Sequence, residues 1–151
     1  MKIYIASDHR GVEVENKITE YLTQMGLTVL KSKMEHTPTD DYVDFALELA
    51  HNVASSDDTL GILLCGTGIG MSIAANKVKG IRAARCVDVD DAFYSKNHNA
   101  ANVICLSSNI EEGYLYEIID TFINTKSASE EKHINRVNKI INYEKETYNE
   151  L

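Results

Sequence analysis

The chain lacks the features that mark several large classes of protein. It has one proline, no tryptophan and three cysteines, none of which forms a CxxC pair. An odd number of widely spaced cysteines argues against a disulfide framework and favours a reducing compartment such as the cytoplasm. No apolar run approaches the ~18 residues that a membrane helix needs, and no signal-peptide pattern follows Met1. We therefore expect a cytoplasmic protein with no membrane partner.

Positive charge is also scarce. The chain has 15 Lys and Arg against 23 Asp and Glu, a net charge of -8, and a sequence pI near 5.1. Nucleic acids and anionic membranes need a basic surface, so both are disfavoured as partners. A small anionic ligand remains compatible, because a few local donors suffice to bind a phosphate. The length of 151 residues predicts one domain, 1–151, that needs no disulfide or metal for stability.

Short apolar runs alternate with segments of helical periodicity along the chain. The runs at 2–6, 27–30, 60–65, 81–84 and 102–106 favour strands. Helices are expected at about 14–25, 41–54, 71–76, 88–97 and 111–122, with a last one from about 129. This order predicts an α/β fold with a five-stranded parallel sheet, helices on both faces and an extra C-terminal helix. No strand follows that last helix, so its apolar residues need another surface, for which a second subunit is a candidate: Ile134, Val137, Ile141 and Tyr148.

The most informative local segment joins the third expected strand to the following helix and reads Cys65-Gly66-Thr67-Gly68-Ile69-Gly70. Alternating glycines let the backbone turn tightly, and unpaired N–H groups at a helix start bind phosphates or oxyanions. The spacing is neither a dinucleotide GxGxxG nor a P-loop. A tight turn without a ligand is the alternative interpretation. Cys65 lies at the strand end, where such sheets bind ligands and where the helix start favours a thiolate.

Three other polar clusters are candidates for a site. Ser7-Asp8-His9 follows the first strand, although Ser7 or Asp8 could simply cap a helix. His98 gains weight as a proton carrier only because we expect Cys65 nearby, since most surface histidines have no catalytic role. Lys132 and Arg136 share one helix face and, by themselves, indicate a solvated charged surface. No His or Cys spacing matches a metal site, so we expect no metal.

These segments together resemble the type B ribose-5-phosphate isomerase family, which also includes galactose-6-phosphate isomerase subunits. The resemblance runs from residue 2 to about 141 and includes the segment 61–77, GILLCGTGIGMSIAANK, whose part from Cys65 to Lys77 is highly specific. The family implies a Rossmann-like three-layer sandwich and a reaction that needs no cofactor. It also implies a homodimer, with a tetramer as an alternative assembly, whose active sites are shared between subunits and include the last helix.

The resemblance implies catalytic roles for four residues. Cys65 is the base that moves a proton between C2 and C1 of the open sugar, and Thr67 positions or activates the thiol. His98 opens the furanose ring, and Asp8 handles the hydroxyl protons. The backbone N–H groups from Gly66 through Gly68 and Ile69 to Gly70 stabilise the enediolate oxyanion.

The remaining matching residues are implied to bind substrate. Asn99 contacts sugar hydroxyls, and Tyr42 is a further substrate contact. His9, Lys132 and Arg136 are phosphate ligands, with Arg136 donated by the partner chain.

The chain departs from the family around the phosphate end of the site. Asn109 and Lys132 stand where members often carry arginine, and lysine keeps the charge but loses the bidentate fork. Arg10, Val43 and the loop 31–39 depart as well, and Lys33 or Lys96 could replace the lost charge. Three functions therefore stay open: an isomerase of ribose 5-phosphate, an isomerase of a hexose phosphate such as allose or galactose 6-phosphate, and a non-catalytic sugar-phosphate-binding subunit.

Overall fold

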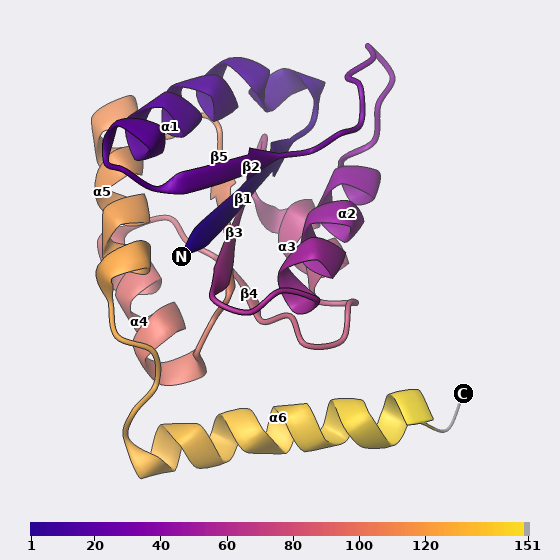
Figure 1. Cartoon of the computed structure of the whole chain (residues 1–151), viewed down its shortest axis with the longest axis vertical. Coiled ribbons are helices and arrows are strands. Elements are labelled where there is room, and N and C mark those ends of the chain that lie inside the picture. The colour runs from indigo at the N-terminus through magenta and orange to yellow at the C-terminus, as the bar shows by residue number, and fades with distance from the viewer. Residues whose placement is uncertain (150–151) are drawn as a thin grey trace.

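A five-stranded sheet forms the centre of the protein. The structure, a computed structural model, describes residues 1–149, with side chains to residue 147. The strands are β1 (Lys2–Ser7), β2 (Thr28–Lys31), β3 (Thr59–Cys65), β4 (Ala83–Arg85) and β5 (Val103–Ser107). Every neighbouring pair is parallel, in the order β2-β1-β3-β5-β4 (Figure 1). The predicted five-stranded parallel sheet is confirmed.

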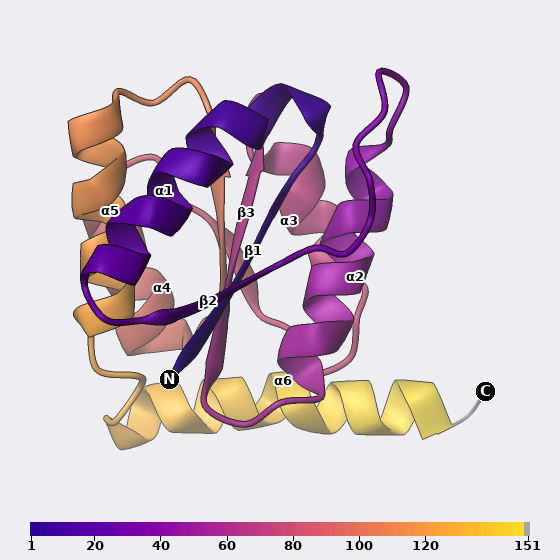
Figure 2. The same cartoon turned by 45° about the horizontal axis from the view of Figure 1, so that its top comes forward.

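Helices cover both faces of this sheet. A short 3₁₀ turn, η1 (His9–Gly11), leads into α1 (Val12–Gln24), and the other helices are α2 (Tyr42–Ala54), α3 (Ile69–Ala75), α4 (Val89–Asn99), α5 (Glu112–Asn124) and α6 (Glu131–Asn149). Helices α1, α4 and α5 pack on one face, and α2 and α3 on the other (Figure 2). The predicted three-layer, Rossmann-like sandwich is therefore confirmed, with α6 as the extra helix.

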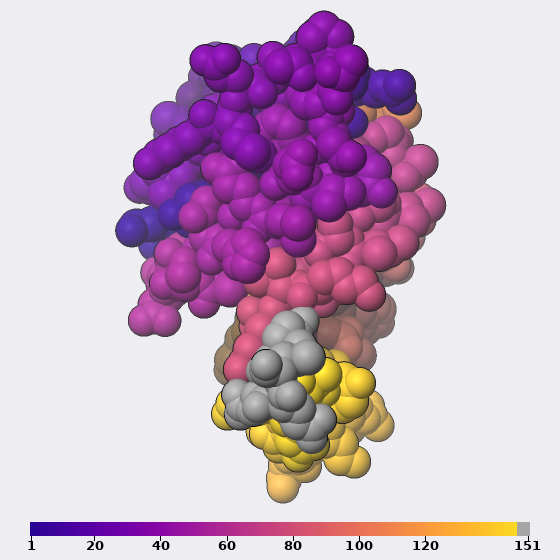
Figure 3. All heavy atoms as spheres, turned by 90° about the vertical axis from the view of Figure 1, so that its right-hand side faces the viewer, coloured from indigo at the N-terminus to yellow at the C-terminus, as the bar shows by residue number. Residues whose placement is uncertain are grey.

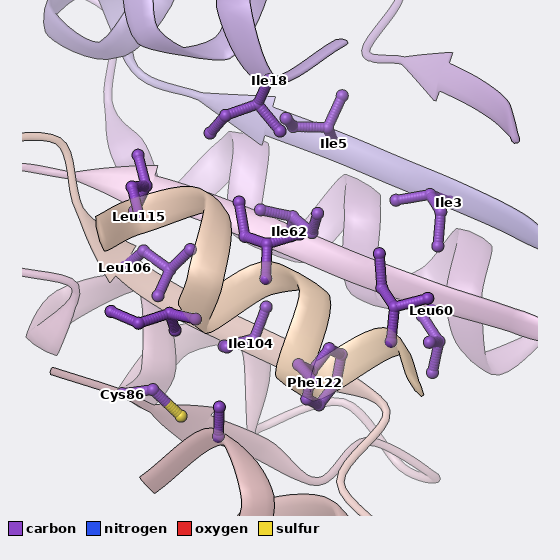
Figure 4. Close-up of a cluster of buried hydrophobic side chains, with 14 of the residues drawn as sticks. Ile3, Ile5, Ile18, Leu60, Ile62, Cys86, Ile104, Leu106, Leu115 and Phe122 are labelled. Carbon is purple, nitrogen blue, oxygen red and sulfur yellow. The ribbon is translucent and has the colours of Figure 1, made fainter. Parts of the chain in front are cut away.

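Alternation along the strands divides the core into two clusters. Ile62 and Leu64 of β3 point toward α1, α4 and α5, and join an aliphatic cluster that also contains Phe122 (Figure 4). Leu63 and Cys65 point the opposite way, toward α2 and α3. The side chain of Cys65 therefore lies on the α2–α3 side, at the carboxyl end of a fully buried strand.

Helix α6 runs beneath the amino ends of the strands (Figure 2) and protrudes below the rest of the molecule (Figure 3). His133 and Val137 are buried, and Ile141 is half-buried. Ile134 stays exposed, so the chain itself covers only part of the helix's apolar surface. The side chain of Tyr148 lies outside the described residues. Across residues 1–149, every helix is too short or too polar to span a membrane.

Candidate active site

The carboxyl ends of β1 and β3 place two of the predicted residues side by side. The strands are hydrogen-bonded neighbours, and Ser7 is in register with Leu64. Asp8 and Cys65 each follow directly, at the same level of the sheet. The chain leaves β1 toward β2 on one side and returns as β3 on the other, so the topological switch point of the sheet lies between these two strand ends. Parallel α/β sheets bind their ligands at such a point.

The thiol of Cys65 is held by the loop that follows it. Its side chain is 6% exposed, and Sγ accepts the backbone N–H of Gly68 at 3.1 Å. Gly68 has φ +78°, and a Cβ there would lie 3.2 Å from the backbone of Cys105 and Leu106. Only glycine combines that conformation with that closeness, so the sequence of the loop dictates the contact to sulfur.

The loop carbonyls are tied down by side chains from neighbouring strands. Ser107 Oγ donates to the Gly66 carbonyl at 2.6 Å, and Asn109 Nδ2 donates to it at 3.3 Å. Arg85 Nε donates to the Thr67 carbonyl at 2.9 Å. With the carbonyls occupied in this way, the loop's conformation is fixed before a ligand arrives. Sequence reasoning missed Ser107 and Arg85, although both end strands at this same edge.

Thr67 and Tyr42 complete this part of the site. The Thr67 hydroxyl accepts the N–H of Ile69 at 3.2 Å, where α3 begins. Tyr42 opens α2 and lays its ring on Gly70, where an added Cβ would come within 2.6 Å of the ring carbon Cζ. Gly70 is therefore needed for a close approach rather than for an unusual backbone angle. Tyr42 itself is partly exposed, with its ring at the mouth of the loop.

Asp8 and His9 lie on the β1 side of this switch point. Asp8 caps η1 by accepting the N–H of Arg10 at 3.1 Å, so the capping interpretation is confirmed for Asp8. His9 Nδ1 lies 2.6 Å from Oδ1 of Asp40, which also accepts the His9 backbone N–H at 3.0 Å. Burial alone would raise the pKa of Asp40, but hydrogen bonds from His9, His36 and Thr37 outweigh it and hold that pKa well below its usual range.

We call these carboxyl-edge residues the thiol half of the site: Asp8, His9, Tyr42 and the segment Cys65–Gly70.

The other two cysteines, Cys86 and Cys105, differ from Cys65 in their surroundings. Burial raises the pKa of Cys86 to about 12, and burial raises the pKa of Cys105 as well. Both thiols therefore stay protonated near neutral pH and pack as core side chains; Figure 4 shows Cys86 among aliphatic neighbours.

The other predicted residues lie at the opposite end of the sheet, near the amino ends of the strands, which we call the amino edge. His98 and Asn99 end α4, which returns from the carboxyl edge to the start of β5. Just before that strand, the Asn102 carbonyl accepts the N–H of Gly61, in the first half of β3. Cys65 lies four residues further along the strand than Gly61, which is about 13 Å of extended chain. Within one chain, the expected closeness of His98 and Cys65 is not found.

Helix α6 packs on this amino edge. The rings of His98 and His133 stack with centroids 3.9 Å apart, and Glu144 accepts the N–H of Gly80 at 3.1 Å. Burial lowers the pKa of His133, and the nearby His98, Lys132 and Arg136 lower it further. We call His98, Asn99, Lys132 and Arg136 the histidine half.

The lysines in and near this half have different surroundings. Lys132 Nζ lies 3.7 Å from Glu130 Oε2, and both side chains are exposed, as is Arg136. Lys96 is buried and donates to the Phe122 carbonyl at 3.1 Å. The suggestion that Lys96 replaces a lost phosphate ligand is therefore wrong.

Comparisons with known proteins identify the family of the chain. Residues 3–140 match the ribose/galactose isomerase family. The chain is 44% identical over 148 residues to a probable ribose-5-phosphate isomerase B of Mycoplasma pneumoniae, covering 95% of each chain. It is 42% identical over 127 residues to the galactose-6-phosphate isomerase subunit LacB of Clostridium acetobutylicum, covering 83% of this chain and 73% of the relative.

Solved structures match equally closely. The crystal structure of ribose-5-phosphate isomerase B from Mycoplasma genitalium with bound ribulose-5-phosphate superposes with a TM-score of 0.90 at 41% identity, covering 96% of this chain and 97% of that one. The Clostridium thermocellum ribose-5-phosphate isomerase B gives a TM-score of 0.89 at 39% identity, covering 97% and 99%.

The parallel sheet makes this an α/β protein with a candidate site at the carboxyl ends of its strands, and the relatives show its class, that of the sugar-phosphate isomerases. The chain belongs to the ribose/galactose isomerase family.

Proposed function

We propose that the enzyme interconverts ribose 5-phosphate and ribulose 5-phosphate, with Cys65 as the base. The observation that carries the proposal is the contact of Cys65 Sγ with the Gly68 N–H, at the end of a buried strand beside Asp8. A hydrogen bond to sulfur from a backbone N–H stabilises the thiolate, which is the form that takes a proton. The names of the Mycoplasma relatives support the pentose phosphate as substrate.

The proposed reaction moves one proton from C2 to C1 of the sugar by way of the thiol. The Cys65 thiolate takes the proton from C2 of the open-chain aldose, and the electron pair moves into a C1–C2 double bond as the carbonyl oxygen becomes an oxyanion. Backbone N–H groups from Gly66 to Gly70 stabilise that charge. The thiol then returns the proton to C1 while Asp8 carries the proton between the hydroxyl oxygens. His98 opens the sugar ring beforehand, and Asn99 binds its hydroxyls.

We propose further that a complete site needs two copies of the chain. The thiol half and the histidine half lie at opposite edges of one sheet, so they cannot act on the same small sugar within one chain. In a two-fold dimer, the thiol half of each copy would face the histidine half of the other, which gives two equal sites. Arg136 and Lys132 would then reach the phosphate from the partner, and His9 would hold it from the thiol half.

The surface between the two halves supports this dimer. It carries exposed apolar side chains on three helices, which are Ile69 and Ile73 on α3, Phe93 and Tyr94 on α4, and Ile140 on α6. A cavity of about 570 Å³ lies among β4, α4 and α6, with Arg82, Arg85 and Asn99 in its lining. Several large apolar side chains exposed near one cavity are typical of an interface rather than of a solvated face.

A hexose phosphate is the second candidate substrate. Asn109 supplies no charge where family members often carry arginine; instead it donates to the Gly66 carbonyl. The clostridial LacB relative is named for galactose 6-phosphate. A site with fewer cationic groups at the phosphate could accommodate a longer sugar whose phosphate sits differently. Rates on ribose, allose and galactose 6-phosphates therefore form part of the test below.

The test measures ketose formation by the wild type and by Cys65→Ala, with a chelator present. We expect the wild type to use ribose 5-phosphate with the highest kcat/KM, and the variant to lose about 10²-fold or more, the size of a general acid–base contribution. Cys86→Ser is the matched control, because it removes a thiol whose raised pKa keeps it from acting as a base.

Each contrary outcome identifies the part that fails. Equal activity of Cys65→Ala and wild type would assign the base to another residue. A higher kcat/KM for a hexose phosphate would replace the pentose with that substrate. Loss of activity in Cys86→Ser as large as in Cys65→Ala would point to damage of the fold, which circular dichroism would detect.

A further inference from the structure

The loop before α2 makes contacts with His9 that the reaction proposed above does not use. Asp40 has a side chain that is 7% exposed, and each of its oxygens accepts two hydrogen bonds. Oδ1 takes the ring Nδ1 of His9 at 2.6 Å and its backbone N–H at 3.0 Å. Oδ2 takes the ring Nδ1 of His36 at 2.9 Å and the backbone N–H of Thr37 at 3.3 Å. One carboxylate thus joins two imidazoles.

The second imidazole is itself anchored. The ring of His36 stacks on the buried ring of Phe45 with centroids 4.8 Å apart. Its Nε2 lies 4.0 Å from Oε2 of Glu15, a buried carboxyl that accepts the Ser7 hydroxyl at 2.8 Å. The chain of contacts therefore starts at the buried pair of Ser7 and Glu15 and ends on His9.

The geometry fixes which nitrogen of His9 is available. A carboxylate can only accept hydrogen bonds, so the 2.6 Å contact requires the proton on Nδ1. Nε2 then faces away from Asp40, on a side chain that is one-third exposed. A phosphate also accepts only, so a phosphate ligand at Nε2 would make both ring nitrogens donors and leave the imidazolium between two anions.

We propose that Asp40, anchored by His36, is a positioning residue for the phosphate end of the substrate. It acts through His9 by holding the Nδ1 proton, fixing the ring plane and presenting Nε2. A carboxylate behind a ligating histidine does the same at metal sites, where its loss costs about 10- to 100-fold. The inference rests on the proposed role of His9 as a phosphate ligand. It also gives a role to a loop that departs from the family pattern.

The direct test needs no substrate. Nitrogen-15 NMR of the histidine side chains reports which ring nitrogen carries the proton. We expect Nδ1 of His9 to be protonated in the wild type and in Glu35→Ala, a control that removes an exposed carboxylate from the same loop. We expect Asp40→Ala to lose that preference. Wild-type His9 with an unprotonated Nδ1 would overturn the proposal whatever the variants do.

A double-mutant cycle then separates positioning from a structural role. If Asp40 acts through His9, Asp40→Ala should raise KM about tenfold with little change in kcat, and should add nothing in a His9→Ala background. Factors that multiply in the double variant would show that Asp40 merely supports the loop. The dissociation constant of inorganic phosphate, measured on the same four proteins, should follow the same pattern.

Failure of this inference can be told apart from failure of the proposed function. If the wild type converts none of the three sugar phosphates, the proposed function fails, whereas the NMR and phosphate-binding cycles still decide whether Asp40 acts through His9. If the wild type is active but the cycle is additive, the isomerase assignment stands and the positioning role of Asp40 falls.

Discussion

Gly68 shows how a single residue can set both the backbone and the chemistry of this site. Its left-handed φ of +78° turns its own N–H toward the Cys65 thiol, at 3.1 Å. Its missing side chain lets the loop lie against the backbone of β5. Gly66, two residues earlier, has open space where a Cβ would be and a φ that any residue can adopt. The two glycines therefore make different demands on the sequence.

This difference predicts that alanine substitutions at the two glycines lower the free energy of unfolding by different amounts. Gly68→Ala should lower the free energy of unfolding by about 1–3 kcal/mol, because a strained φ and a backbone contact both oppose the methyl group. Gly66→Ala should change it by no more than about 0.5 kcal/mol. Urea unfolding at one fixed protein concentration measures both. Equal costs for the two variants would show that the loop relaxes around Gly68.

Among single residues, sequence analysis identified those that belong to a regular pattern and missed those that lie in irregular segments. Cys65 and its glycines were identifiable because they follow a buried strand with a regular spacing. Asp40 and His36 lie in an irregular loop, and nothing in their spacing shows that the loop folds back onto His9. Lys96 was misjudged for a related reason: a lysine on a helix is usually solvated, and only the tertiary packing buries it against α5.

The packing of helix α6 on the rest of the chain depends on a titratable side chain, that of His133. His133 is nearly buried and stacks on His98 of α4. The groups around it are His98, Lys132 and Arg136, all of which oppose a proton on His133, and Glu130, which favours one. Burial and these cations hold its pKa in the folded protein below the ordinary value of 6.5.

The sign of the resulting pH dependence follows directly. A histidine with a lowered pKa binds its proton more readily once the helix is detached, so protonation favours detachment. Docking of α6 should be strongest above pH 6.5 and weaken as the pH falls from there through the lowered pKa of His133. Hydrogen exchange of the α6 amides, corrected for intrinsic rates, should show constant protection from pH 7.5 to 6.5 and falling protection below pH 6.5.

Two variants make this prediction specific to the stack. His133→Gln cannot be protonated, so α6 protection should become nearly independent of pH over this range. His51→Gln removes an exposed histidine of α2 and should behave like the wild type. Protection that falls equally in all three proteins would assign the effect to other groups.

Most elements were predictable because they carry their own periodicity. All five strands and the long helices occur where the apolar spacing placed them, within about two residues at each end, the usual uncertainty of element boundaries. The start of α3 was set two residues late, because Gly68 caps the helix from inside the glycine segment. Helix α6 was visible as an amphipathic segment, but the sequence could not say that it lies under the amino edge of the sheet.

On the scale of the whole molecule, the two halves of the site lie at opposite edges of one sheet. The sequence suggested that His98 and Cys65 belong to one site, and family resemblance alone suggested that two chains build it. The topology supports the proposed dimer, because a crossover helix that starts at the carboxyl end of one strand must end at the amino end of the next parallel strand. In the proposed dimer, the thiol half of one copy meets the histidine half of the other.

A mixing experiment tests this arrangement. Cys65→Ala and His98→Ala should each be inactive alone, because every site in either homodimer lacks one group. In a mixed dimer, one site combines the intact thiol half of the His98→Ala chain with the intact histidine half of the Cys65→Ala chain, and the other site lacks both groups. If subunits exchange at random, half of the dimers are mixed and half of their sites work, so about a quarter of wild-type activity should return. Light scattering should show a dimer throughout. If the mixture stays inactive although subunit exchange is demonstrated with labelled chains, then His98 and Cys65 do not meet across a dimer interface and the shared site is wrong.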